Sequence, residues 1–104
     1  MTEQPPFGTA ELLSAVAGAG RVLDLAKFLA RQGRHEESDA AFQRAAEIAP
    51  NSPRILFERA SAYVRSGRNL DQARALLKQY LASPLTPDDP PREQAEKLLR
   101  QTGS

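Results

Sequence analysis

Residues 21–34 read RVLDLAKFLARQGR, and the spacing within this stretch decides the fold. Four of its apolar residues fall at i, i+3, i+4 and i+7: Val22, Leu25, Ala26 and Leu29. This spacing is typical of a helix that buries one stripe of its surface. Gly33 follows, at the place where a glycine commonly ends a helix in the left-handed conformation. The stretch therefore predicts a helix that ends in a tight turn.

The pattern returns later in the chain, with a second glycine turn in the sequence RSGR at residues 65–68. The repeated positions are Leu56, Ala60, Tyr63 and Gly67, each 34 residues after Val22, Ala26, Leu29 and Gly33. A further helix is expected after each turn, with Phe42 and Ala45 facing inward in the first copy. Leu77 and Tyr80 match them at an interval of 35 residues, because one residue is inserted in the second turn. The sequence predicts two helix-turn-helix units and no strand.

Capping residues and prolines mark the expected helix boundaries. Pro53 stands at the expected first position of a helix. Proline lacks a backbone N–H, and at this position an N–H would have no partner within the helix. Gln72 lies three residues after Asn69, which predicts a capping box. A last helix is expected at about 90–101, closing the array. The expected N-caps of these three helices are Ser52, Asn69 and Asp89.

The N-terminal segment is expected to hold a flexible arm at residues 1–8 and a helix that begins at Thr9. Gly18 and Gly20 cost about 2 kcal/mol of helix propensity relative to alanine. A bend or break is therefore expected at these glycines, with one continuous helix as the alternative. The apolar run at 11–20 lacks the basic residues that precede a secretory signal, so we expect a cytoplasmic protein.

The composition fits one non-catalytic domain, residues 9–104. A chain of 104 residues with 40% hydrophobic content and a net charge of +1 has no overall attraction to nucleic acid or membrane. Without cysteine, thiolate metal ligands and nucleophiles are excluded, and one histidine, His35, is too few for a metal site. No glycine-rich phosphate loop is present. We therefore expect no enzyme activity, no metal and no cofactor.

The two copies resemble the tetratricopeptide repeat (TPR) family, whose unit is a helix-turn-helix of 34 residues. The first unit (about 19–52) and the second (about 53–87) carry its small, aromatic and glycine positions. These positions are Ala26, Gly33, Phe42, Ala45 and Pro50, then Ala60, Tyr63, Gly67 and Ala73. The resemblance implies an all-α, TPR-like α-solenoid with an N-terminal helix and a C-terminal capping helix.

In this family the first helix of each unit lines a concave groove, and the resemblance implies the same here. On a helical projection, ten residues form the predicted groove face, which lies about 120° from the predicted core stripe. They are Leu23, Lys27, Arg31, Arg34, Arg54, Phe57, Ser61, Val64, Arg65 and Arg68. Arg54 stands at the beginning of this face in the second unit. A row of cations above apolar side chains suits an acidic partner segment with apolar anchors. The last helix is expected to extend this face with Arg92, Leu99 and Arg100, opposed by Glu96.

The predicted function is therefore a protein-interaction scaffold or adaptor that binds a peptide or protein partner in a basic groove. One alternative is that these arginines are ordinary solvated residues. Another is a structural oligomerisation module that associates through apolar ends, where Leu12, Leu13 and Val16 lie at one end and Leu76, Leu98 and Leu99 at the other. Nucleic acid is a less favoured partner because of the small net charge and the few aromatic residues.

Overall fold

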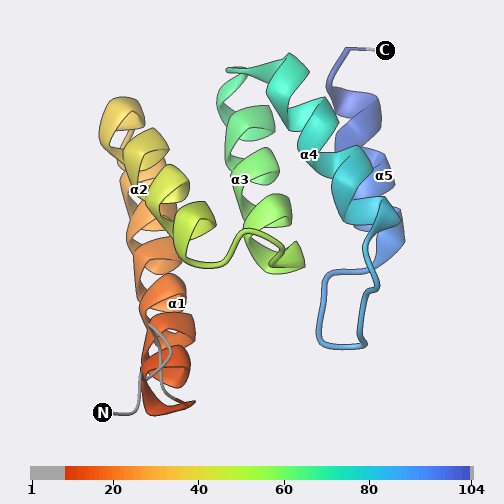
Figure 1. The fold of residues 1–104 in the computed structure, drawn as a ribbon. Coiled ribbons are helices and arrows are strands. Elements are labelled where there is room, and N and C mark those ends of the chain that lie inside the picture. The colour runs from red at the N-terminus through yellow and green to blue at the C-terminus, as the bar shows by residue number, and fades with distance from the viewer. Residues whose placement is uncertain (1–8, 104) are drawn as a thin grey trace, which may run out of the picture. The chain divides into compact units, whose positions relative to one another are not determined.

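The computed structural model describes residues 9–103, with side chains from Gly18 onward, and these residues form helices and no strand. The helices are α1 (Thr9–Arg31), α2 (His35–Ile48), α3 (Pro53–Ser66), α4 (Leu70–Ala82) and α5 (Arg92–Gln101) (Figure 1). The chain divides into two compact units, Met1–Pro50 and Asn51–Ser104. The first contains the α1–α2 hairpin, and the second contains the α3–α4 hairpin with α5. The predicted all-α fold of two helix-turn-helix repeats is confirmed.

The glycine turns close both hairpins in the same way. Gly33 and Gly67 have left-handed backbones, with φ values of 76° and 65°. The N–H of Arg34 donates to the carbonyl of Leu29 at 3.0 Å, and the N–H of Arg68 donates to that of Tyr63 at 3.0 Å. These bonds satisfy helix-end carbonyls and form the Schellman arrangement. The two turns predicted from the repeated glycines are therefore equivalent in structure.

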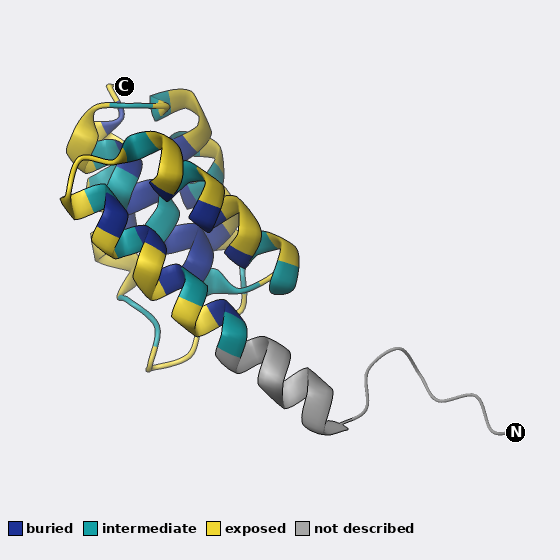
Figure 2. Cartoon of the chain, turned by 90° about the vertical axis from the view of Figure 1, so that its left-hand side faces the viewer, coloured by how far each residue is buried: buried dark blue, intermediate teal, exposed yellow. Residues whose placement is uncertain are grey.

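Equivalent positions of α1 and α3 are buried. Leu23 and Phe57 are 6% and 7% exposed, and Ala26 and Ala60 are both 0% exposed. In the second helices, the predicted inward positions Phe42 and Leu77 are also fully buried. Figure 2 shows that the described helices carry buried positions alongside exposed ones, as amphipathic helices do. The repeat thus sets which side of each helix packs.

The predicted stripe on α1 is rotated in the structure. Leu25 is 51% exposed instead of buried, whereas Leu23, expected on the groove face, lies in the core. The physical reason is that α1 carries apolar residues on several sides, including Phe28, which is 47% exposed. Overlapping stripes are therefore available in the sequence, and the buried one contains Leu23 and Ala26, with Ser38 of α2 bonded to the Ala26 carbonyl.

The predicted break in α1 is wrong, because the helix runs through Gly18 and Gly20 without interruption. A Cβ at either glycine would meet nothing within 4 Å, so neither residue is needed for a close approach. Ala19 and Leu23 are buried in the same helix. Packing of such a face outweighs weak propensity in most protein helices. The arm at residues 1–8 lies outside the described residues, as do the side chains of residues 9–17.

Ser52 and Asn69 occupy the predicted N-cap positions, Asp89 does not, and only Ser52 makes the expected side-chain bond. The Ser52 side chain accepts from the N–H of Ile55 at 3.5 Å, as expected of an N-cap. Asn69 instead adopts a left-handed conformation, φ 50°, and its side chain makes no capping bond. Asp89 accepts from the N–H of Thr86 at 2.9 Å and so closes a turn before α5. The helix α5 begins only at Arg92, because two prolines precede it.

Candidate partner-binding site

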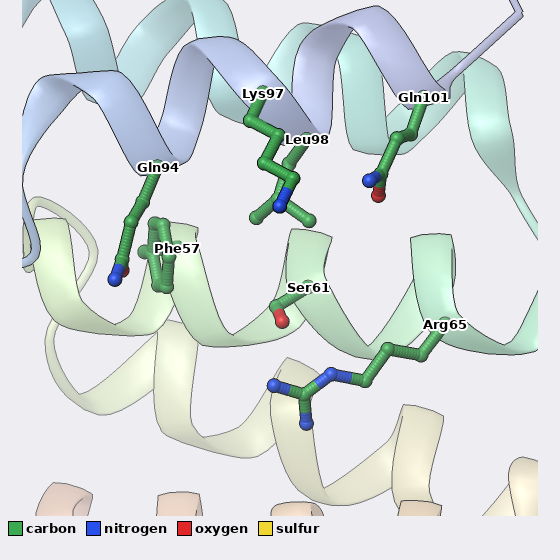
Figure 3. A pocket seen from close by; sticks show the side chains of 7 residues that line it. All are labelled: Phe57, Ser61, Arg65, Gln94, Lys97, Leu98 and Gln101. Carbon is green, nitrogen blue, oxygen red and sulfur yellow. The ribbon is translucent and has the colours of Figure 1, made fainter.

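A cleft lies between α3 and α5 in the second unit. From α3 it is lined at i, i+4 and i+8 by Phe57, Ser61 and Arg65, all three of which the sequence places on the groove face. This spacing puts the three side chains in one row along the helix. The opposite wall comes from α5: Gln94, Lys97, Leu98 and Gln101. The cleft has a volume of about 290 Å³ (Figure 3).

The cleft is lined by two apolar residues, Phe57 and Leu98, which we call its floor, and by five polar residues. Phe57 is 7% exposed and packs on Tyr80, with ring centroids 5.3 Å apart. Leu98 is partly buried against the same core cluster. In Figure 3 the side chains of Gln94, Lys97 and Gln101 reach from α5 toward α3. The cleft therefore offers a small apolar surface surrounded by hydrogen-bond donors.

The lining of the cleft carries two positive charges and no acidic residue. Arg65 and Lys97 are both exposed, and within residues 18–103 neither side chain makes an ion pair or a hydrogen bond. These two cations therefore have no ion-pair partner among the residues that the structure describes. Such a surface attracts anionic groups and repels cations.

Ser61 is unusual because it is a polar residue at the wall of this cleft with only 5% of its surface exposed. Its hydroxyl makes no hydrogen bond among residues 18–103. No fully covered side-chain oxygen or nitrogen lacks a partner in that part of the chain, so the Ser61 hydroxyl is not fully covered. Figure 3 shows the Arg65 side chain extending back along α3 toward it. A ligand in the cleft would find both donors together.

Three anchors hold α5, and so hold the second wall of the cleft. The Arg74 guanidinium donates to the carbonyl of Thr102 at 2.9 Å, just after the end of α5. The Tyr80 hydroxyl donates to the carbonyl of Pro90 at 2.7 Å, just before its start. Arg92 donates to the carbonyl of Leu81 at 2.6 Å. Because both ends of α5 are tied to α4, the cleft is part of the folded unit.

Burial of the Tyr80 ring raises the pKa of its hydroxyl above the usual value of 10.0, and the nearby negative charge of Asp89 raises it further. Arg92 and Arg54 act in the opposite direction. The neutral phenol, which donates to Pro90, is therefore the favoured form in the folded unit.

The other predicted groove residues of the second unit lie around the cleft but not in its lining. Val64 is partly buried against the core, and Arg54 is exposed at the start of α3. Arg68 is half-buried and interacts within the fold. Their role in binding stays a prediction.

In the first unit the predicted groove residues differ in how accessible they are to a partner. Arg31 is exposed, whereas Leu23 is buried in the core and has little area for a partner. Arg34 makes a bidentate contact with Glu37, at 2.8 Å and 2.7 Å. Lys27 is half-buried and interacts within the fold. Among the predicted groove cations of this unit, Arg31 is thus the most accessible to a partner.

The sequence did not predict the α5 wall of this cleft. The last helix was expected to extend the groove face with Arg92, Leu99 and Arg100, opposed by Glu96, and that role stays a prediction. The cleft is lined by a different side of α5. The reason is geometric. The side of a helix that faces the preceding repeat differs from the side that faces a following one, and α5 faces α3 through the former. The missed residues do carry a signal, since Gln94, Lys97, Leu98 and Gln101 fall at i, i+3, i+4 and i+7.

No metal-binding arrangement is found among the side chains that the structure describes. Residues 18–103 hold no group of three or more His, Cys, Asp or Glu side chains placed to bind a metal ion. None of the helices searched there combines the length and the apolar character that a membrane crossing requires.

A family model described as tetratricopeptide repeat matches residues 19–62. Comparison with curated proteins and with solved structures gave no significant match. The matched segment begins in α1, passes through the complete α2 helix and ends within α3. Its helices, its glycine turn and the repeat of buried positions agree with that description. The match, together with these helices, supports a tetratricopeptide repeat over residues 19–62.

Proposed function

We propose that this protein is a non-catalytic interaction scaffold or adaptor that binds an acidic segment of a partner protein. TPR units generally mediate protein–protein interactions, and they are typically non-catalytic. The finer statement, that the bound segment is acidic, rests on the side chains of this chain. Arg65 and Lys97 line the α3–α5 cleft, and the exposed Arg31 lies on the predicted face of α1.

The observation that carries the proposal is the charge of the cleft lining. Its two cations have no acidic residue beside them in the lining, and its floor contains the apolar Phe57 and Leu98. A partner segment that combines a carboxylate with an apolar side chain satisfies both features. Charge-assisted hydrogen bonds to arginine then give specificity, and the apolar contact adds binding energy.

Affinity capture from the native lysate, followed by peptide mapping of the bound protein, tests this function. The variant with Arg31→Glu and Arg65→Glu is expected to lose the captured partner. A matched variant with Arg44→Glu and Lys78→Glu reverses two exposed cations on α2 and α4, outside the proposed surfaces. It should retain the partner. Equal capture by both variants would show that these surfaces do not bind it.

Self-association is the second candidate function, and one observation favours it. Leu25 and Phe28 are large apolar residues with half of their surface exposed, and they are neighbours on the outer side of α1. The apolar residues expected at the other end, Leu76, Leu98 and Leu99, are partly buried in the core of their own unit. Light scattering over a range of concentrations, with Leu25→Gln and Phe28→Gln as the disrupting change, tests this alternative.

A further inference from the structure

We propose that the α3–α5 cleft binds a phosphorylated side chain of the partner segment in preference to a single carboxylate. This inference rests on the proposed function, and it assigns the chemistry of the group that enters the cleft. Its basis is the combination of Arg65, Lys97 and Ser61 in one lining.

Charge balance is the first argument. The cleft lining holds two cations and no acidic residue, so its formal charge is +2. A carboxylate neutralises one of these charges, whereas a phosphomonoester carries about −1.5 to −2 at neutral pH. Since Arg65 and Lys97 make no ion pair within residues 18–103, a ligand does not have to displace an internal partner. A doubly charged group therefore gains more than a singly charged one.

The supply of donors is the second argument. Arginine presents a planar fork that matches phosphate oxygens, and lysine adds a compact point charge. Ser61, a residue with 5% of its surface exposed, lines the cleft and adds a hydroxyl that has no hydrogen bond among residues 18–103. Gln94 and Gln101 contribute amide donors at the rim. A phosphate has three terminal oxygens to use these donors, whereas a carboxylate has two.

The apolar floor gives the third argument, because it indicates that the anionic group belongs to a peptide. Phe57 and Leu98 lie in the same cleft as the cations, and a volume of about 290 Å³ leaves room for more than one small ion. A neighbouring apolar residue or the methylene of the modified side chain can cover this floor. A free inorganic ion would leave it exposed to water.

Titration of the full-length, ¹⁵N-labelled protein with blocked single amino acids tests the cleft without the unidentified partner. The probes are N-acetyl-phosphoserine amide, N-acetyl-glutamate amide and N-acetylserine amide, at constant ionic strength and pH 7.5. We expect saturable amide shifts in residues 57–65 and 94–101. The phosphoserine probe should bind about five-fold tighter than the glutamate probe, the effect of one added charge near 4 Å in water. The serine probe should not bind.

Acidification separates the two anions further. The second pKa of the phosphate is about 6, so at pH 5 the probe is mostly a monoanion, while glutamate stays ionised. The advantage of phosphoserine should therefore disappear between pH 7.5 and pH 5. If the advantage persists at pH 5, the charge argument is wrong and the preference rests on the third phosphate oxygen and its donors.

Three variants and one matched control identify the residues involved. Arg65→Gln and Lys97→Gln should each weaken phosphoserine binding, and Ser61→Ala should weaken it about tenfold, as expected for a lost bond to a charged group. Lys78→Gln removes the same charge from an exposed position on α4 and should have no effect. Arg65 and Lys97 are exposed and glutamine is a good helix former, so the fold should survive, which circular dichroism checks.

The outcomes also separate this inference from the proposed function. Equal affinity for phosphoserine and glutamate, or an equal loss in Lys78→Gln and Arg65→Gln, would refute the phosphate site. The function itself would still stand if the lysate partner is captured by the native protein and lost in the charge-reversed variant. Selective phosphoserine binding without any captured partner would instead support the site and count against the adaptor.

Discussion

The two units use the same repeat positions but fill them with different side chains. In the first unit the positions equivalent to Phe57 and Tyr80 hold Leu23 and Ala45, and all four residues are buried. The aromatic residue of the second helix is thus one turn earlier in the first unit, at Phe42, where the second unit has Leu77. The second unit therefore has the larger side chain at two of these three equivalent positions.

The difference has a consequence for function. Tyr80 contacts Phe57 with its ring and the loop before α5 with its hydroxyl, so it links a residue that lines the cleft to the segment that leads into α5. The methyl side chain of Ala45 is too short for such contacts and carries no donor. The first unit leaves Leu25 and Phe28 exposed, the two large apolar residues of the described chain with that property. One aromatic residue thus connects core packing with the cleft.

The largest effect is expected from Tyr80→Ala, which removes this connection. Replacement of a fully buried aromatic residue by alanine costs about 3–5 kcal/mol of unfolding free energy. The loss should be confined to the second unit, because Tyr80 packs there. Amide hydrogen exchange measures it residue by residue. Equal loss of protection in α1 and α2 would mean that the two units unfold together.

A pair of leucines tests which side of α1 forms the core. Leu23→Ala removes a side chain that is 6% exposed and should cost about 2–5 kcal/mol, whereas Leu25→Ala removes one that is 51% exposed and should change stability by less than about 0.5 kcal/mol. Urea unfolding of both variants gives the comparison. Similar losses in the two variants would contradict the rotation of the helix that the structure shows.

Tyr80→Phe isolates the hydroxyl from the ring. The loss of the 2.7 Å bond to the Pro90 carbonyl should cost about 1 kcal/mol. Burial raises the pKa of Tyr80 above 10.0 in the folded state. The stability that depends on the neutral phenol is therefore complete below pH 10 and is lost as the pH rises through the raised pKa.

Thermal unfolding between pH 8 and pH 11 measures this dependence in the native protein and in Tyr80→Phe. The native protein should show the steeper loss above pH 10, because its unfolded chain releases the Tyr80 proton first. Identical pH profiles for the two proteins would show that the Tyr80 hydroxyl does not contribute.

The smallest effect is expected from Ser38→Ala, which makes the first unit resemble the second. Ser38 is 2% exposed, and its hydroxyl donates to the carbonyl of Ala26 at 2.9 Å. The equivalent residue in the second unit is Ala73, which makes no such bond. We expect a loss of about 0.5–1.5 kcal/mol in urea unfolding. Unchanged stability would mean that the bond is offset by the better helix propensity of alanine.

Much of the fold could be predicted because local chemistry determines it. The glycines at 33 and 67 adopt the left-handed conformation that few other residues accept, and Ser52 caps α3 as its sequence context indicates. The failures involve choices that depend on tertiary contacts. Asn69 has a good capping-box spacing, but its left-handed backbone prevents the capping bond.

The candidate site was predictable on one wall only. Phe57, Ser61 and Arg65 follow from the repeat, because α3 presents its groove face to the cleft. The α5 wall depends on how that helix docks on α4, through the Arg74 and Tyr80 bonds, which sequence periodicity does not encode. Arg31 and Arg65 are thus equivalent in the repeat, but only Arg65 has an opposite wall within its own unit.

The most direct test of the account is the ¹⁵N NMR spectrum of the full-length protein with the partner segment that affinity capture and peptide mapping define. The account predicts that shifts concentrate in residues 57–65 and 94–101 and vanish in a variant with Arg65→Glu and Lys97→Glu. Shifts that instead concentrate around Leu25 and Phe28, and persist in that variant, would contradict it.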